Sequence, residues 1–191
     1  MVDTTQLLIS FLLFMLLPIW GIAGFADWLC HRSTNIENTS GLKESLMHSL
    51  MGVQIGIPII LCLFFEINVF ILMICILTWV LHELVAHWDV HFATPRRKIS
   101  IWEMHAHNYL GSLPMYMLIT ILIINWPIFL KLLSFNWGNK SFFFTPLQTP
   151  HGGEGYLPTY LTFMAIFCVF PYFEENIRCL RVVIKNRQKQ K

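Results

Sequence analysis

The sequence predicts an all-α fold, a polytopic integral membrane bundle of about five transmembrane helices that forms a single domain. Two observations predict this, and a third excludes one class of function. Hydrophobic residues make up 55% of the 191 residues and charged residues only 13%, about half of the roughly 25% found in soluble domains. Apolar runs of about 20 residues, the length that crosses a bilayer core, recur along the chain. The formal net charge of +2 excludes a generally basic nucleic-acid-binding protein.

The apolar runs define the expected spans in chain order. No basic residue precedes the first run, which is long for a signal peptide, so we expect it to remain in the protein. The second and third are joined by a hairpin, and the fourth and fifth flank an aromatic-rich segment typical of a membrane interface. The spans are residues 7–29, 46–65, 67–86, 109–133 and 156–173, followed by a basic cytoplasmic tail, residues 174–191.

Basic residues predict the orientation. Arg and Lys occur in the loops after the first and third spans and in the tail, but not in the hairpin Glu66-Ile67-Asn68. Because short cytoplasmic loops are enriched in basic residues, the N-terminus is expected outside and the C-terminus in the cytoplasm. Arg96 and Arg97 contribute to this signal, and they could also bind an anionic headgroup or a carboxylate substrate.

Histidines gather at the predicted cytoplasmic ends of the spans. Seven of the eight lie there with several acids, and because charged groups at membrane depth cost about 2.5–3.5 kcal/mol each, we expect them to be paired. Three acid–histidine pairs have the i, i+4 spacing that places both side chains on one helix face. These pairs are Asp27 with His31, Glu44 with His48, and Glu103 with His107.

The third span offers two alternative stripes. His82 and Asp89 lie about 20° apart around a helix, so they share a face. Glu83, His87 and His91 form a second stripe that points elsewhere. We prefer His82 with Asp89, because they repeat the pattern of one acid and one histidine from each helix.

A carboxylate and an imidazole from each helix form a mixed ligand set that suits iron, zinc or manganese. Ferritin-like bundles hold two metal ions with a related Glu-x-x-His spacing. We therefore predict two metal ions, with iron as the first choice. The predicted ligands are Asp27, His31, Glu44, His48, His82, Asp89, Glu103 and His107, with His105 supporting a ligand from behind and Glu83, His87 and His91 as alternatives.

Structural roles for these residues are the alternative to metal binding. Glu103 follows Ser100 at the spacing of a capping box, so it could serve only to begin the fourth helix. The whole set could form a ring of salt bridges at the membrane interface.

Histidines at one face of a small helical membrane protein resemble the histidine-box enzymes, which include membrane fatty-acid desaturases, hydroxylases and sterol oxidases. This resemblance implies a di-iron centre that uses oxygen to oxidise a lipid chain.

A second resemblance rests on Asp27-Trp28-Leu29-Cys30-His31-Arg32, Ile36-Glu37 through Gly41, Glu44 to His48, Glu66-Ile67-Asn68, His82, Trp88-Asp89-Val90, Arg96-Arg97 and Glu103-Met104-His105-Ala106-His107. These stretches resemble a family of small bacterial inner-membrane proteins of unestablished activity, sometimes labelled diguanylate cyclases. This second resemblance implies that the protein lies in a bacterial inner membrane. It also implies that the polar residues of these stretches form one site.

The first functional hypothesis is a di-iron oxidoreductase of the hydroxylase or desaturase type, acting on a lipid-like substrate with an electron donor. Its metal site would face the cytoplasm. The alternatives are a metal transporter or metal-binding membrane protein, a haem-binding protein, and a non-enzymatic membrane subunit that uses the polar residues for docking.

Overall fold

The computed structural model describes residues 3–189, apart from the side chains of residues 139–140. Helices account for 81% of the chain, and the described residues contain no strand, so the all-helical prediction is confirmed. Five helices are long and apolar enough to cross a membrane, the number predicted from the sequence. The side of the membrane that each end faces stays a prediction.

Of the five long helices, the first four are joined by short connections, and a long connection precedes the fifth. In chain order they are Thr4–Ser33 (α1, Thr4–Phe11; a π-helical turn, Leu12–Leu16; α2, Leu17–Ser33), α3 (Leu42–Phe64), α4 (Val69–Ala93), α5 (Ile101–Ile124) and Tyr156–Lys189 (α7, Tyr156–Met164; a π-helical turn, Ala165–Val169; α8, Phe170–Lys189). Three shorter segments complete the described structure: 3₁₀ turns at Ile36–Asn38 and Asn139–Phe142, and α6 (Trp126–Leu133).

The fourth long helix, Ile101–Ile124, begins and ends about nine residues earlier than the predicted span, residues 109–133. It begins at Ile101 because Ser100 caps it, with the Ser100 hydroxyl accepting a hydrogen bond from the Glu103 backbone N–H at 3.1 Å. It ends before Pro127, which lacks the N–H needed to continue a helix and lies in the first turn of α6. The early start places Glu103 and His107 on the first turns of α5, as their i, i+4 spacing predicted.

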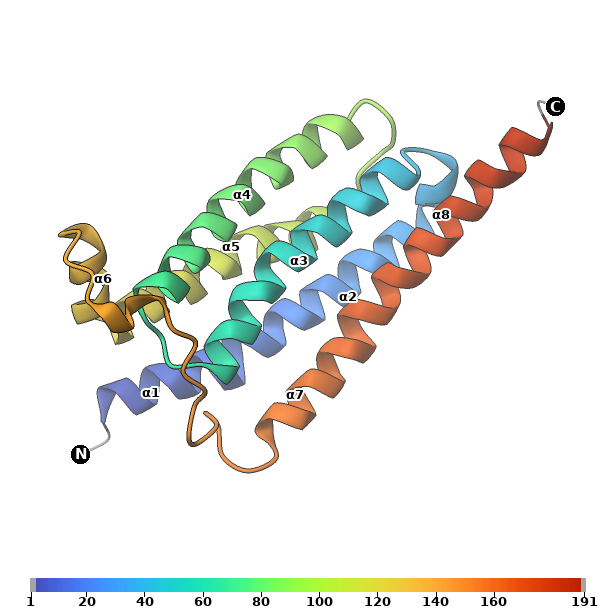
Figure 1. Cartoon of the computed structure of the whole chain (residues 1–191). Helices are drawn as coiled ribbons and strands as arrows, with labels where there is room; N and C mark the ends of the chain where they lie inside the picture. Colours follow the sequence, from blue (N-terminus) through green and yellow to red (C-terminus); the bar gives the residue numbers. More distant parts are fainter. Residues whose placement is uncertain (1–2, 190–191) are drawn as a thin grey trace.

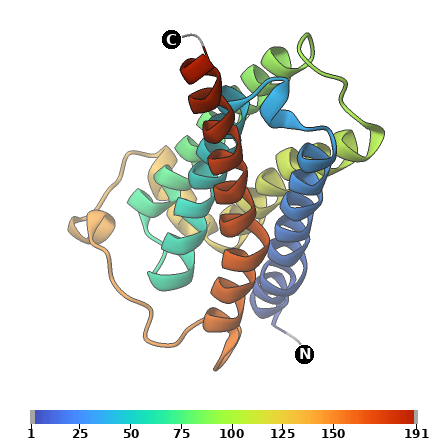
Figure 2. The ribbon, with the colours of Figure 1, turned by 90° about the vertical axis from the view of Figure 1, so that its right-hand side faces the viewer.

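The fifth long helix extends beyond the predicted span. The segment expected as a basic tail continues as α8 to Lys189. Figure 2 shows α8 running along the bundle between α2 and α3. Side chains of α8 therefore enter the interior, where the tail prediction placed none.

The connections between the helices lie at the two ends of the bundle (Figure 1). The α2–α3 and α4–α5 connections lie at the end where the C-terminus is drawn, and the N-terminus lies at the opposite end with α6. The long connection after α6 is held to the α3–α4 turn by backbone hydrogen bonds from Glu66 to Thr145 and from Leu147 to Phe64, at 2.8 and 2.9 Å.

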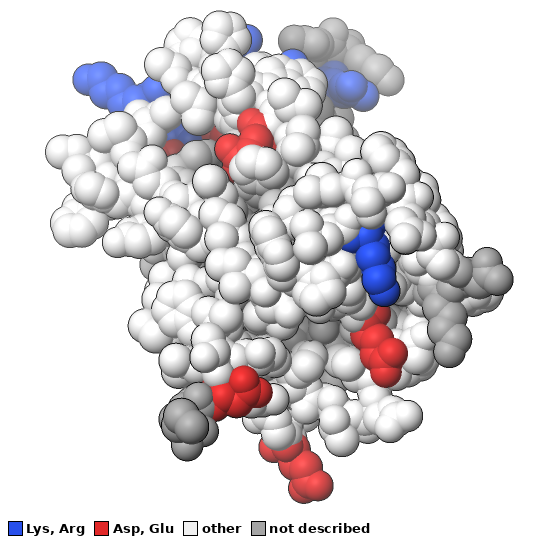
Figure 3. All heavy atoms as spheres, turned by 90° about the vertical axis from the view of Figure 1, so that its left-hand side faces the viewer, with Lys and Arg blue, Asp and Glu red and all other residues white. Residues whose placement is uncertain are grey.

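The bundle interior is divided along its length. The half nearer the N-terminus is filled by an apolar core of Leu13, Leu16, Leu17, Trp20, Ile55, Leu63, Leu113, Met117 and Tyr160. The outer surface is also apolar, with Leu7, Ile22, Val53 and Leu77 each more than half exposed. Figure 3 shows few charged side chains on the face that it presents. Helices that are apolar both inside and outside fit a lipid environment.

Candidate metal centre

A buried polar cluster occupies the half of the bundle near the α2–α3 and α4–α5 connections. Its side chains come from α2, α3, α4, α5, α8 and the α4–α5 connection. None is more than 3% exposed except His107, which is 23% exposed. The polar cluster consists of Asp27, His31, Glu44, His48, Asp89, Arg97, Glu103, His107 and Glu175.

One group of potential ligand atoms surrounds His31. Its Nε2 atom lies 3.3 Å from Asp27 Oδ2 and 3.4 Å from Glu103 Oε1. The ligand atoms of these three side chains lie within 4.8 Å of one another, close enough to share one metal ion. Three protein ligands around one ion leave a coordination position open, as catalytic metal sites do.

A second group surrounds His48. Its Nε2 atom lies 3.4 Å from Asp89 Oδ2 and 3.7 Å from Glu44 Oε1. The Nε2 atom of His107 is 3.4 Å from the same Asp89 oxygen, and its Nδ1 atom is 3.3 Å from Asp27 Oδ1 in the first group. His107 therefore connects the two groups, which together contain seven of the eight predicted ligands.

Glu175 of α8 contacts both central histidines from the opposite side. Its Oε2 atom is 3.0 Å from His31 Nδ1, and its Oε1 atom is 3.2 Å from His48 Nδ1. Because an ionised carboxylate only accepts hydrogen bonds, this contact places the ring proton on Nδ1 and leaves a lone pair on Nε2. The two rings stack, with 4.4 Å between their centroids. Carboxylates in this position orient histidine ligands in metal sites.

Several buried atoms of the polar cluster have no hydrogen-bond partner. The Nε2 atoms of His31 and His48 are buried and form no hydrogen bond, although carboxylate oxygens lie nearby; Asp89 Oδ1 and Glu103 Oε2 are also unpartnered. An unsatisfied buried polar atom costs about 1–3 kcal/mol. Cations between these nitrogen and oxygen atoms would satisfy them together, so the donor set fits metal ions.

Arg97 is the one permanently charged cation within the polar cluster. Its Nε atom donates to Glu44 Oε1 at 3.0 Å, and its Nη2 atom pairs with Glu103. Burial alone would lower the pKa of Arg97, but hydrogen bonds to Glu103 and Glu44 raise it above its ordinary value, so it stays charged. With neutral histidines, the five carboxylates and one guanidinium leave a formal charge of −4. Two divalent cations would balance that charge.

The two neighbouring arginines have different environments. Both were expected to face a headgroup or a substrate. Arg96 is exposed, and its Nη1 atom donates to the Phe92 carbonyl at 2.6 Å. The buried side chain of Arg97 instead engages both oxygens of Glu44. Arg97 therefore competes with a metal ion for Glu44 more strongly than for any other predicted ligand.

His82 is the predicted ligand that lies apart from the polar cluster. It is 4% exposed, and neither of its ring nitrogens has a hydrogen-bond partner. The structure thus brings Asp89, but not His82, into the cluster. The alternative ligands and the supporting histidine are all exposed: Glu83, His87, His91 and His105.

Helix α8 supplies residues that the sequence analysis missed. Besides Glu175, the Tyr172 hydroxyl lies 3.3 Å from Asp27 Oδ2, and Asn176 donates to the Ser49 hydroxyl at 2.6 Å. These three residues are spaced by three and four positions, which is the spacing of one helix face. That spacing continues beyond the predicted end of the fifth span and was the available signal.

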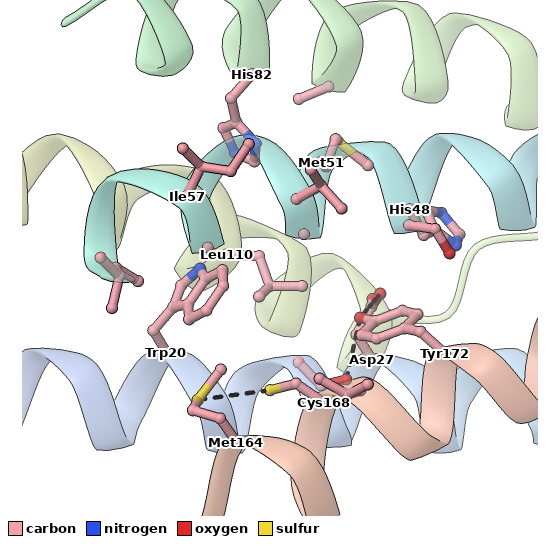
Figure 4. A pocket seen from close by; sticks show the side chains of 18 of the residues that line it. Trp20, Asp27, His48, Met51, Ile57, His82, Leu110, Met164, Cys168 and Tyr172 are labelled. Atoms are coloured by element: carbon pink, nitrogen blue, oxygen red, sulfur yellow. Dashed lines mark hydrogen bonds between the residues drawn. The ribbon is translucent and has the colours of Figure 1, made fainter. Parts of the chain in front are cut away.

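A cavity of about 1060 Å³ begins at the polar cluster and extends between the helices. Figure 4 shows Asp27, His48 and Tyr172 at one end and Trp20 and His82 further along. Most of the remaining lining is apolar. Some lining residues, such as Val53 and Ile57 of α3 and Val169, are about half exposed on the outer surface. The cavity therefore connects the polar cluster with the apolar exterior of the bundle.

Comparison of the chain with protein-family models, with curated proteins and with solved structures finds no match.

Proposed function

We propose that this protein is a metal-dependent integral membrane enzyme, a di-iron oxidoreductase that acts on a lipid-like substrate. The observation that supports this most strongly is the pair of buried Nε2 atoms on His31 and His48, which face carboxylate oxygens without hydrogen bonds. The charge of the cluster supports two divalent ions. Mixed nitrogen and oxygen ligands favour iron, with zinc and manganese as the alternatives.

The residues divide into two ligand sets. Asp27, His31 and Glu103 would hold one ion. His48, Asp89 and His107 would hold the other, with Glu44 shared between that ion and Arg97. A bound iron pair would supply the oxidation of an unactivated carbon–hydrogen bond by molecular oxygen.

The chain's own groups would position the substrate and exclude water. Glu175 fixes both histidine rings, and the cavity places an apolar chain next to the ligands. Because the cavity reaches the outer surface near Val53 and Ile57, a lipid could enter from the bilayer without crossing water. We also propose that the N-terminus lies outside and the metal centre faces the cytoplasm of a bacterial inner membrane, where an electron donor is available.

The apolar core argues against the transporter alternative. Beyond His82, the described interior contains mainly the apolar core residues, with no charged side chain among them. A transport path for a cation would require polar groups through that half of the bundle.

The enzymatic proposal predicts a defined change in lipid mass. The iron-loaded protein, supplied with oxygen, a reductant and bacterial lipids, is expected to produce lipids that have gained one oxygen atom or lost two hydrogen atoms. In hydroxylation, one oxygen atom enters the carbon–hydrogen bond and the other leaves as water, with two electrons from the reductant and two protons. In desaturation, the two hydrogen atoms from the chain, two electrons from the reductant and two protons reduce both oxygen atoms to water. Mass spectrometry of the extracted lipids measures this change.

The matched control is His48→Gln, which removes a ligand but keeps a polar side chain of similar size. It is expected to abolish the mass change. Absence of any product from iron-loaded, folded protein would contradict the oxidoreductase proposal.

A further inference from the structure

The deep part of the cavity contains polar atoms that the polar cluster does not explain. Trp20, Tyr160 and His82 all line the cavity and are 6%, 4% and 4% exposed. The Trp20 Nε1 atom, the Tyr160 hydroxyl and both His82 ring nitrogens have no hydrogen-bond partner. Unpaired polar atoms are expensive in a membrane interior, so their presence in the lining of one cavity calls for an occupant.

These side chains come from different helices but point into one space. Figure 4 shows Trp20 of α2 and His82 of α4 on opposite walls of the cavity, with Leu110 of α5 beside the Trp20 ring. Tyr160 of α7 stacks on Tyr156, with 5.9 Å between ring centroids. The neighbouring Tyr156 hydroxyl already donates to the Leu13 carbonyl at 2.7 Å. Only the Tyr160 hydroxyl of this stacked pair is therefore left for a ligand.

The available hydrogen-bonding groups restrict the chemistry of the occupant. An indole N–H can only donate, so the group that meets Trp20 must be an acceptor. A tyrosine hydroxyl and a neutral histidine can also donate to the same acceptor. The rest of the lining is mostly apolar, and a volume of about 1060 Å³ is at the upper end of the range for ligand pockets. The occupant is therefore long, apolar and equipped with an accepting oxygen.

We propose that the cavity binds a long-chain lipid with a carbonyl-type oxygen, which lies between Trp20, Tyr160 and His82 while the chain extends toward the metal centre. This proposal rests on the proposed function, because the bound lipid is a substrate only if the metal centre oxidises it. It assigns His82 to substrate binding instead of metal binding. It also places the reacting carbon on the chain, away from the oxygen.

The test compares two probes of equal chain length. Undecyl methyl ketone carries the oxygen, and tridecane lacks it. Binding of each to the purified protein in lipid nanodiscs is expected to favour the ketone. Tyr160→Phe and Trp20→Phe are each expected to reduce this preference roughly two- to tenfold, the range of one net hydrogen bond.

Tyr156→Phe is the matched control, because it removes a tyrosine hydroxyl that already has a partner. It is expected to lower the melting temperature without changing the preference for the ketone. Tyr160→Phe should instead reduce the preference for the ketone and leave the melting temperature unchanged, because deleting an unpaired buried hydroxyl does not destabilise the free protein.

Equal binding of the two probes, no binding of either, or a preference that survives both Trp20→Phe and Tyr160→Phe would overturn the proposal and indicate that water satisfies these atoms. The measurement is repeated after metal removal with a chelator. A ketone preference in a protein that never holds metal would refute the proposed function alone. A metal-loaded protein without the preference would refute this inference alone.

Discussion

Replacement of Glu175 by glutamine is expected to lower the affinity for metal about 10- to 100-fold. The carboxylate accepts hydrogen bonds from Nδ1 of both His31 and His48. A glutamine amide offers one accepting oxygen and one donating nitrogen, so it can accept from only one of the rings. The other ring must then accept at Nδ1 and carry its proton on Nε2, the atom that should bind the metal. Competition titration with a chromogenic chelator measures this effect.

Glu174→Gln is the matched control for this prediction. Glu174 is adjacent in sequence, but its side chain is 39% exposed and pairs with Arg32 and Arg178 at the surface. We expect its substitution to leave metal affinity within a factor of about two, since surface ion pairs contribute little. Equal affinities of the two variants would show that Glu175 does not position the ligands.

Replacement of Arg97 by methionine is expected to destabilise the metal-free protein by about 3–5 kcal/mol. Methionine keeps an unbranched apolar side chain but removes the guanidinium that neutralises Glu44 and Glu103. Both carboxylates are at most 1% exposed, so their charges would lose their partner without gaining water. Denaturant unfolding in detergent, after treatment with a chelator, measures the loss.

Arg96→Met provides the comparison at a neighbouring position. Arg96 is exposed and contacts its own helix end, so its substitution is expected to change the free energy of unfolding by at most about 0.5 kcal/mol. If the metal ions compensate the same carboxylates, added metal should restore part of the stability lost in Arg97→Met. A variant as stable as Arg96→Met would contradict the role given to Arg97.

The parts of the site that the sequence predicted depend on local geometry. Asp27 with His31 and Glu44 with His48 contact each other because residues four apart share a helix face. The number of long apolar helices depends on composition and length, and it is confirmed. Periodicity also separated Asp89, which is buried in the cluster, from the exposed His87.

The parts that the sequence did not predict depend on contacts between distant segments. Glu175 reaches His31 across 144 positions. The helical spacing of Tyr172, Glu175 and Asn176 indicates a shared face, but it does not identify which residues that face contacts. His82 and Asp89 share one face of α4, but they are about two helical turns apart. Only Asp89 reaches the histidines, and His82 faces the cavity. A shared face does not specify depth along a helix.

The backbone and the side chain of Glu103 have different partners. Its backbone N–H donates to the Ser100 hydroxyl, which caps the helix. Its side chain faces Arg97 and His31, so Glu103 does not serve only to begin the helix, and its role as a metal ligand stays a prediction. The Ser100 cap fixes the residue at which α5 begins. Because Glu103 lies in the first turn of that helix, its carboxylate points into the polar cluster.

Metal analysis of the purified protein tests the central claim most directly. Elemental mass spectrometry on protein purified without chelators is expected to find about two metal ions per chain, predominantly iron. His82→Gln should retain that content, whereas His48→Gln should lose at least one ion. A folded protein with a metal content near zero, unchanged after incubation with iron, zinc or manganese, would contradict the account and identify the polar cluster as a network of salt bridges.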